Sequence, residues 1–259
     1  MTGKDFVDAE RRRATPPTLV ADALDAVLAA RAAQTGRAAL DVVDVGAGTG
    51  GFAVQLAALG HHVTVVDPSP DALAAARWRA AELGVTLTAV QGEAGDLATL
   101  AGEGTADLVV CHNVLEYVDS PAAAMTAIAR VLRAGGAVSV LAANVVAAVL
   151  QRALAGRYDE ARRLLDPDSG PVSDSAPTPG SAVTEHRRFT LPELTALIED
   201  AGLRAGEAQG IRVFAGLLPG AGADPNAADA LRELEAAAAG YPALRDIAAR
   251  LHVVAFRGS

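Results

Sequence analysis

The run from Asp41 to Phe52, DVVDVGAGTGGF, combines residue types that can hold a charged small molecule. An apolar strand carries a carboxylate near its end, and a glycine-rich turn and a helix follow it. Glycine allows a tight turn with positive φ and lets a ligand approach the backbone with no Cβ in the way. A helix that begins at such a turn directs unpaired N–H groups at the bound molecule. We interpret the run as a cofactor-binding turn formed by Asp44, Gly46, Ala47, Gly48 and Gly50.

Two cofactors are compatible with this glycine spacing, and each spacing alone is weak evidence. Gly46, Gly48 and Gly51 fit the dinucleotide pattern G-x-G-x-x-G, whereas Gly46, Gly48 and Gly50 fit G-x-G-x-G. A carboxylate at Asp44 would repel a pyrophosphate but attract the sulfonium and ammonium of S-adenosylmethionine. The segment therefore resembles the first motif of class I S-adenosylmethionine-dependent methyltransferases. A dinucleotide-dependent reductase is the weaker alternative, because no Tyr-Lys proton-relay pair is evident.

Two later segments support a cofactor with a nucleoside. Asp67 ends the second expected strand, about 20 residues after the glycine turn, where a carboxylate accepts hydrogen bonds from ribose hydroxyls in dinucleotide folds. We count Pro68, which follows it, as a cofactor-binding residue as well, and an ordinary turn over residues 67–70 is the alternative. The segment Gly92–Leu97 resembles the methyltransferase loop that meets the adenine edge. This resemblance implies adenine contacts from Glu93 and Ala94, against the alternative of a solvated loop.

The segment Cys111–Tyr117, CHNVLEY, follows the fourth expected strand. In methyltransferases this segment lines the floor beneath the methyl group, so the resemblance implies cofactor or substrate contacts for His112 and Asn113. A packing role for His112 remains open, and we expect Cys111 to be a core residue. Glu116 and Tyr117 either contact the substrate or lie at an exposed helix end.

Motifs in the second half of the chain narrow the resemblance to one family. They follow one order and comprise His112–Glu116, Asn144-Val145, Ala155–Asp159, Gly210–Phe214, Glu233–Glu235, Tyr241-Pro242 and Leu251–Ala255. Together they resemble the bacterial tRNA 5-carboxymethoxyuridine methyltransferases, which convert the carboxylate of a modified wobble uridine into a methyl ester. A carboxylate with a pKa of about 4 is ionised at neutral pH and needs no general base. Arginine binds carboxylates with a bidentate fork, and the resemblance implies this role for Arg212.

The acceptor is less constrained than the cofactor. A tRNA-facing patch is expected from Arg152, Arg157, Arg162, Arg163, Arg187 and Arg188, although solvated helix faces explain them nearly as well. The acidic or neutral segment at 166–184 and the divergent segment 14–17 depart from the family pattern. The alternatives are a small-molecule or natural-product acceptor and a cofactor-binding subunit without catalytic activity.

Composition sets further limits on function. The 259 residues carry a net charge of −9, which disfavours a broad nucleic-acid-binding surface because Lys and Arg contacts to phosphates dominate such affinity. The single cysteine excludes a disulfide framework. The polar start is unlike a secretory signal, and no apolar run is long enough to cross a bilayer. We expect a cytoplasmic protein with neither a metal nor a membrane partner.

The elements that position these residues alternate between strand and helix, which predicts an α/β fold. The resemblance implies a Rossmann-like, seven-stranded, mostly parallel sheet with helices on both faces and a helical substrate-side insertion. We expect a turn at 133–136, a short helix at 241–250 and a Thr190–Glu193 capping box. We expect a single methyltransferase domain with an N-terminal helical segment (1–38), a cofactor-binding core (39–144), a helical insertion and loop (145–190), and C-terminal strands and helices (191–259).

Overall fold

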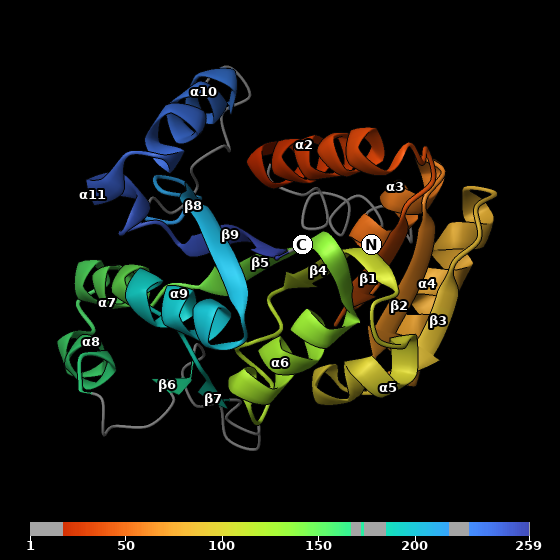
Figure 1. The fold of residues 1–259 in the computed structure, drawn as a ribbon. Coiled ribbons are helices and arrows are strands. Elements are labelled where there is room, and N and C mark those ends of the chain that lie inside the picture. Colours follow the sequence, from red (N-terminus) through yellow and green to blue (C-terminus); the bar gives the residue numbers. More distant parts are fainter. Residues whose placement is uncertain (1–17, 167–171, 174–184, 218–227, 259) are drawn as a thin grey trace. The chain divides into compact units, whose positions relative to one another are not determined.

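The computed structural model describes residues 18–166, 172–173, 185–217 and 228–258. Seven strands form one mixed sheet (Figure 1), in the order β3 (Thr88–Gln91), β2 (His62–Asp67), β1 (Asp41–Val45), β4 (Ala106–His112), β5 (Leu132–Ala143), β9 (Arg250–Arg257) and β8 (Leu203–Ile211). Strand β1 is parallel to both β2 and β4, and β2 is parallel to β3. The predicted α/β class and seven-stranded sheet are confirmed.

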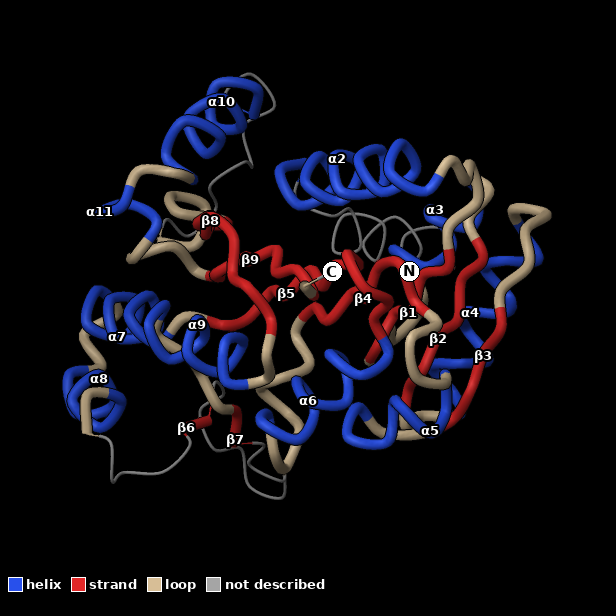
Figure 2. The backbone as a smooth tube through the Cα atoms, in the orientation of Figure 1, coloured by secondary structure: helices blue, strands red, loops and turns tan. Residues whose placement is uncertain are grey.

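Helices connect these strands, and a short antiparallel pair lies outside the main sheet. Helices α3 and α4 pack along β2 and β3 (Figure 2). The helices are α2 (Thr18–Thr35), α3 (Gly51–Ala58), α4 (Pro70–Glu82), the 3₁₀ helix η1 (Ala94–Asp96), α5 (Leu97–Ala101), α6 (Pro121–Val131), α7 (Val145–Leu154), α8 (Tyr158–Leu164), α9 (Leu191–Asp200), α10 (Ala228–Ala239) and α11 (Pro242–Arg245). The separate pair is β6 (Val172–Ser173) with β7 (Glu185–His186).

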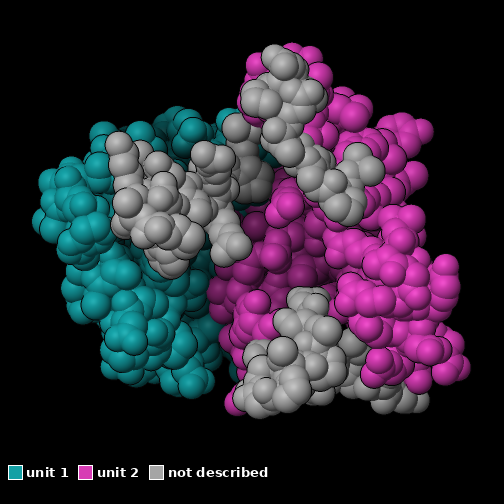
Figure 3. Space-filling model, turned by 180° about the vertical axis from the view of Figure 1, so that it is seen from behind, with its two compact units in different colours: residues 1–111, 123–139, 256–259 teal, residues 112–122, 140–255 magenta. Residues whose placement is uncertain are grey.

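The chain divides into two compact units (Figure 3). One unit comprises Met1–Cys111, Ala123–Ser139 and Phe256–Ser259, and the other comprises His112–Ala122 and Val140–Ala255. The single-domain organisation expected from the sequence stays a prediction. None of the helices that the structure describes is both long enough and apolar enough to span a bilayer.

Local sequence signals explain where several elements begin. Strands β1 and β4 are buried along nearly their whole length, as their continuous valine-rich runs require. Helix α4 begins after Ser69, whose hydroxyl accepts a hydrogen bond from the Ala72 N–H at 3.2 Å. The predicted capping box of α9 is confirmed, because Thr190 and Glu193 each accept a bond from the other's backbone N–H.

Two predicted elements are wrong at their ends. The expected turn at 133–136 belongs to β5, where Gly135 adopts φ 71° and its N–H donates to the Gly258 carbonyl at 3.4 Å. The short helix expected at 241–250 ends at Arg245. Beyond it the Asn144 side-chain amide donates to the carbonyls of Asp246 and Ala248 at 2.9 and 2.8 Å, and the Ala249 N–H donates to the Arg212 carbonyl at 3.2 Å instead of continuing the helix. Most of the loop expected at 166–184, and all of 14–17, lie outside the described residues.

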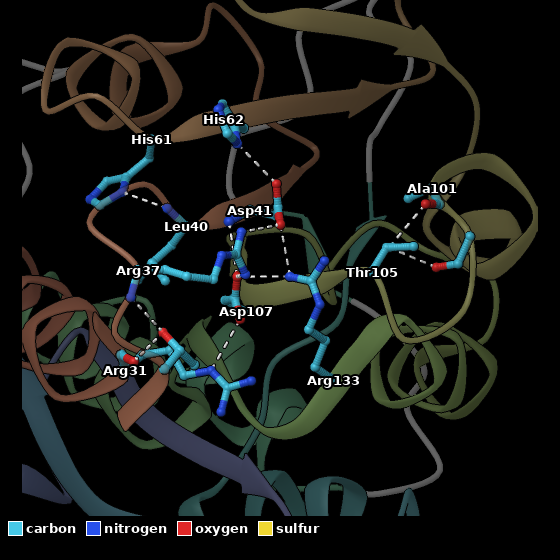
Figure 4. A network of polar contacts seen from close by, with 12 residues as sticks. Arg31, Arg37, Leu40, Asp41, His61, His62, Ala101, Thr105, Asp107 and Arg133 are labelled. Carbon is cyan, nitrogen blue, oxygen red and sulfur yellow. Dashed lines mark hydrogen bonds and ion pairs between the residues drawn. The ribbon is translucent and has the colours of Figure 1, made fainter. Parts of the chain in front are cut away.

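A buried carboxylate joins helix α2 to the amino ends of three strands (Figure 4). The Asp107 side chain is 0% exposed and accepts bonds from Arg31 Nε at 3.1 Å, Arg37 Nη1 at 2.9 Å and Arg133 Nη1 at 2.7 Å. It also accepts the backbone N–H of Asp41 at 3.0 Å. This network, called here the Asp107 cluster, ties the starts of β1, β4 and β5 together at the edge opposite the glycine turn.

Candidate functional site

The glycine turn between β1 and α3 adopts the left-handed backbone conformation at three positions. The φ angles of Gly46, Gly48 and Gly50 are 62°, 52° and 76°, values that favour glycine. A Cβ on Gly50 would lie 2.7 Å from the Ala76 Cβ, whereas a Cβ on Gly48 would meet no atom within 4 Å. Gly50 therefore allows α3 to pack against α4, and Gly48 leaves open space above the turn for a ligand.

Asp67 connects the glycine turn to the ends of β2 and β3. Its Oδ2 accepts the Gly48 N–H and its Oδ1 accepts the Ser69 N–H, both at 2.9 Å. Its backbone carbonyl accepts the Gly92 N–H at 3.2 Å. The residue is 6% exposed. These bonds fix the carboxylate, and each oxygen keeps a further lone pair with which to accept a ligand hydroxyl.

Asp44 is buried beneath the same turn, with 4% of its surface exposed. Burial raises the pKa of its carboxyl to about 7; a backbone hydrogen bond from Ala53 opposes the rise, and the charge of Asp67 adds to it. A nearby cation would favour the ionised form. The site thus fits a cationic ligand with hydroxyl groups better than an anionic pyrophosphate.

The remaining cofactor residues predicted from the sequence lie in the same unit. Ala47 accepts the Gly50 N–H at 2.9 Å, which closes the turn. Pro68 is exposed, and its carbonyl accepts Gln91 Nε2 at 3.1 Å. Glu93 is exposed in extended conformation just before η1, and Ala94 is buried as its first residue. Their contacts with an adenine ring stay predictions.

Arg79 of α4 supports the turn and was not expected from the sequence. Its Nη1 donates to the Thr49 carbonyl at 2.6 Å and to the Thr49 hydroxyl at 2.9 Å. An arginine in the last turn of an amphipathic helix has no sequence signature that separates it from a solvated one. Only the structure identifies it as a clamp on the glycine turn.

His112 and Asn113 belong to the second unit. Burial, and then the neighbouring His252, lower the pKa of His112 to about 3, so the imidazole is neutral at physiological pH. The two rings meet edge to face with centroids 6.0 Å apart. Asn113 adopts φ 56° and donates its N–H to the Leu141 carbonyl at 2.8 Å. His112 therefore cannot act as a general acid there, and contacts of both residues with a ligand stay predictions.

A cavity of about 200 Å³ in the second unit is lined by three arginines, Arg188, Arg212 and Arg250. Its other described lining residues are neutral: Ala143, Asn144, Ala147, Ala148, Gln151, Gly216 and Ala249. The lining described here includes neither His112 nor Asn113. We call this cavity the arginine pocket. Its charge suits an anionic ligand.

Arg212 is held in a strained backbone conformation at this pocket. Its φ is 60°, and among the described residues only Asn113 shares a positive φ without being glycine. The Arg212 carbonyl accepts the N–H of Gly216 at 3.1 Å and that of Ala249 at 3.2 Å. A Cβ on Gly216 would lie 2.5 Å from that carbonyl oxygen. Strain of this kind concentrates at functional sites, which supports the prediction for Arg212.

Glu116 lies behind the pocket and is buried, contrary to the exposed helix end that was one alternative. Its Oε1 accepts the Ala143 N–H at 2.7 Å and faces Arg250 Nη1 at 3.5 Å. Its backbone carbonyl accepts the Arg187 N–H at 3.1 Å. Burial raises the pKa of Glu116, and the Ala143 bond and Arg250 oppose the rise. Glu116 therefore anchors the end of β5 and one arginine of the pocket.

The comparisons with known proteins agree with this geometry. A family model described as a methyltransferase domain matches residues 43–140, which contain the glycine turn, Asp67 and β4. Over these residues the chain is a methyltransferase domain of the class I, S-adenosylmethionine-dependent type. The magnesium protoporphyrin IX methyltransferase from Synechocystis PCC 6803, solved with bound SAH, has the same fold: its TM-score is 0.58 at 17% identity, over 98% of this chain and 88% of that one.

Two curated relatives match this chain over part of their length. The tRNA 5-carboxymethoxyuridine methyltransferase of Escherichia coli K12 is 32% identical over 155 residues, covering 56% of this chain and 58% of the relative. The ubiquinone biosynthesis O-methyltransferase of Xanthomonas euvesicatoria pv. vesicatoria is 30% identical over 171 residues, covering 66% of this chain and 65% of the relative. The chain thus spans less than two thirds of either relative.

The cofactor of this class, and therefore of this domain, is S-adenosyl-L-methionine. The open space above Gly48, the fixed carboxylate of Asp67 and the buried carboxyl of Asp44 suit its ribose and its positive charges. No cluster of three or more His, Cys, Asp or Glu side chains that could hold a metal ion occurs within the described part of the chain.

Proposed function

We propose that this methyltransferase esterifies a carboxylate, and that its acceptor is the carboxylate of 5-carboxymethoxyuridine in tRNA. The arginine pocket carries the proposal. Three arginines, Arg188, Arg212 and Arg250, line a cavity of about 200 Å³ whose other described lining residues are uncharged. Guanidinium groups bind carboxylates with two parallel hydrogen bonds. An acceptor with a single negative charge is therefore attracted and oriented there.

The chemistry of the pocket favours an acceptor that is already ionised. When bound, S-adenosylmethionine supplies a methyl group on a positively charged sulfur, and transfer to a carboxylate gives a neutral ester. A neutral hydroxyl acceptor must first lose a proton to a base. The described pocket lining contains no carboxylate, imidazole or amine that would take this proton. A carboxylate needs no such base, so the work of the pocket is to orient the acceptor and exclude water.

The relatives are named for different acceptors, and the charge of the pocket supports the choice between them. One is named for tRNA 5-carboxymethoxyuridine and the other for O-methylation in ubiquinone biosynthesis. The cationic lining without a base supports the first chemistry for this chain. Ester formation also makes the product neutral, which weakens its attraction to the arginines and aids release.

Fewer arginines are exposed for contact with tRNA than the sequence suggests. Arg152 is 2% exposed and lies 3.5 Å from Glu160, so it cannot belong to an exposed patch. Arg188 lines the pocket. The exposed members of the expected set are Arg157, Arg162, Arg163 and Arg187. We propose that these four contact the phosphates around the modified nucleotide, which would make binding strongly salt-dependent.

The experiment incubates the protein with methyl-labelled S-adenosylmethionine and tRNA carrying 5-carboxymethoxyuridine, then treats the RNA with mild alkali. Label that enters the RNA and is released by alkali identifies a methyl ester. Arg212→Ala is expected to abolish this label while leaving S-adenosylmethionine affinity unchanged, because Asp44, Asp67 and the glycine turn belong to the other unit.

Arg204→Ala is the matched control, since Arg204 is an exposed arginine on β8, the strand that leads to Arg212. The control is expected to label RNA like the unmodified protein. Absence of label with protein that binds the cofactor would refute tRNA as the acceptor. A panel of small carboxylates would then be tested in the same alkali-release assay.

A further inference from the structure

The carboxylate of Glu235, on α10, accepts three consecutive backbone N–H groups. Its Oε2 accepts the Val213 N–H at 2.7 Å, and its Oε1 accepts those of Phe214 at 3.0 Å and Ala215 at 2.7 Å. These residues directly follow Arg212 at the end of β8. Successive N–H groups that converge in this way form a concave anion-binding nest. In this protein the anion is a side chain of the protein itself.

The same turn is held from its other side. The Arg212 carbonyl accepts two backbone N–H groups, from Gly216 and Ala249. Beneath the turn, Val213, Ala238 and Ala248 form a buried apolar cluster, against which Phe214, Leu244 and Ile247 pack. Figure 1 shows α10 and α11 near the end of β8. The backbone on both sides of Arg212 is therefore fixed, and α10 supplies the only side chain among the described contacts that binds these three N–H groups.

These hydrogen bonds hold Arg212 in a backbone conformation that a non-glycine residue rarely adopts. A non-glycine residue at φ 60° is less stable than one in an ordinary backbone conformation. Charge-assisted hydrogen bonds are worth more than neutral ones, and three of them end on one carboxylate. Without Glu235 the turn would relax and Arg212 would lose its fixed place in the arginine pocket.

We propose that Glu235 is a positioning residue for anion binding: its carboxylate fixes the 212–216 turn so that Arg212 presents its guanidinium in the arginine pocket. The proposal deepens the proposed function, and rests on it only for the identity of the anion. Glu235 itself bears a negative charge, so it acts through the backbone of Val213, Phe214 and Ala215 and not by contact with the acceptor.

The test variant is Glu235→Gln, because it leaves an acceptor for two of the three N–H groups and removes the acceptor of the third. The amide oxygen can still accept from Phe214 and Ala215, but an NH₂ group then faces the Val213 N–H. The residue next to Arg212 thereby loses its acceptor. Glu233→Gln is the matched control, since Glu233 lies exposed on the same helix and the substitution changes charge in the same way.

The readout is the NMR signal of the Arg212 Nε–H group, assigned with Arg212→Lys and followed during titration with acetate. Acetate tests carboxylate binding without assuming any acceptor. Glu235→Gln is expected to weaken acetate binding at this signal at least about tenfold, because one bond is lost and the other two are no longer charge-assisted. Glu233→Gln is expected to match the unmodified protein, and both variants are expected to bind S-adenosylmethionine normally.

A double-mutant cycle separates positioning from general stability. If Glu235 acts through Arg212, the double variant Glu235→Gln/Arg212→Ala binds acetate no more weakly than Arg212→Ala, as followed at the Nε–H signal of Arg250, which lines the same pocket and is present in every variant. Additive losses, unchanged acetate binding in Glu235→Gln, or no acetate response at Arg212 in the unmodified protein would each overturn the proposal. If Glu235→Gln fails to fold, hydrogen exchange on the unmodified protein decides: the Val213, Phe214 and Ala215 amides must be protected, and rapid exchange overturns it.

The outcomes also distinguish this proposal from the proposed function. Acetate binding that depends on Glu235, with no methyl ester formed on tRNA, supports the positioning role and refutes tRNA as the acceptor. Methyl ester formation with acetate binding that ignores Glu235 supports the acceptor and overturns the positioning role.

Discussion

Cofactor affinity is expected to rise with pH, because the buried carboxyl of Asp44 must be ionised to attract a cation. Burial raises its pKa to about 7 in the free protein. Binding of positively charged S-adenosylmethionine favours the ionised form and so lowers this pKa. The affinity is therefore full above the pKa of the free protein and falls as pH drops through it.

The magnitude follows from the fraction of Asp44 that is ionised. With a pKa of about 7, roughly one tenth of the carboxyl is ionised at pH 6 and roughly nine tenths at pH 8. If only the ionised form binds, the dissociation constant for S-adenosylmethionine is about tenfold larger at pH 6 than at pH 8, or about 1.4 kcal/mol. At pH 7, binding should release about half a proton.

Isothermal titration calorimetry at pH 6, 7 and 8, in buffers of different ionisation enthalpy, measures both quantities. Asp44→Asn is the control, because the amide resembles the protonated carboxyl and keeps an oxygen for the Ala53 N–H. This variant also corrects for any titration of the cofactor itself. The variant should bind more weakly at pH 8 and show little pH dependence beyond that of the cofactor. The same pH profile in both proteins would refute the reasoning.

Four further substitutions test other parts of the fold. Asp67→Ala removes the acceptor of the Gly48 N–H and of the expected ribose bonds, and should weaken S-adenosylmethionine binding at least about tenfold by calorimetry. Asp107→Asn should lower the free energy of unfolding at pH 7 by about 3 kcal/mol, measured by urea denaturation, because a buried charge partner of three arginines is lost. Gly50→Ala should destabilise the protein through contact with Ala76, whereas Gly48→Ala should fold and lose cofactor binding.

Each of these has an outcome that contradicts it. Unchanged cofactor affinity in Asp67→Ala would remove the ribose assignment. Burial raises the pKa of Asp107, but the Asp41 N–H and Arg31 outweigh it and hold the pKa below its usual value. The stability that Asp107 contributes is therefore present above the usual carboxyl range and lost at lower pH, so a destabilisation as large at pH 3 as at pH 7 would contradict it. Equal urea midpoints for the two glycine variants would contradict the packing argument.

The glycine turn, the buried strands and the cap of α9 were predictable because each depends on a short stretch of sequence. The glycine turn requires positive φ over a few residues, and the structure has it at Gly46, Gly48 and Gly50. The valine-rich strands and the capping box of α9 are likewise determined by residues that are close together in the sequence. Asp67 follows from its distance to the turn, and the structure joins the two with one hydrogen bond.

The failures concern partners that are far apart in the sequence. The extent of β5 past the expected turn depends on Gly258, and the early end of α11 depends on the Asn144 side chain. Burial of Arg152 depends on α8 folding back so that Glu160 reaches it. The role of Glu235 depends on N–H groups about twenty residues earlier, which no periodicity indicates. Such pairings become visible only when tertiary structure brings the segments together.

The Asp107 cluster has a consequence for how this fold tolerates change. It fastens α2 and the starts of β1, β4 and β5, whereas the glycine turn and Asp67 occupy the opposite ends of the strands. The ion pairs that hold the strands together and the residues expected to bind the cofactor therefore lie at opposite ends of the strands. Loops at the binding edge can lengthen, shorten or exchange residues without loosening these ties. A library that randomises the binding-edge loops should therefore retain a larger folded fraction than one that randomises the segments around Arg31, Arg37 and Arg133.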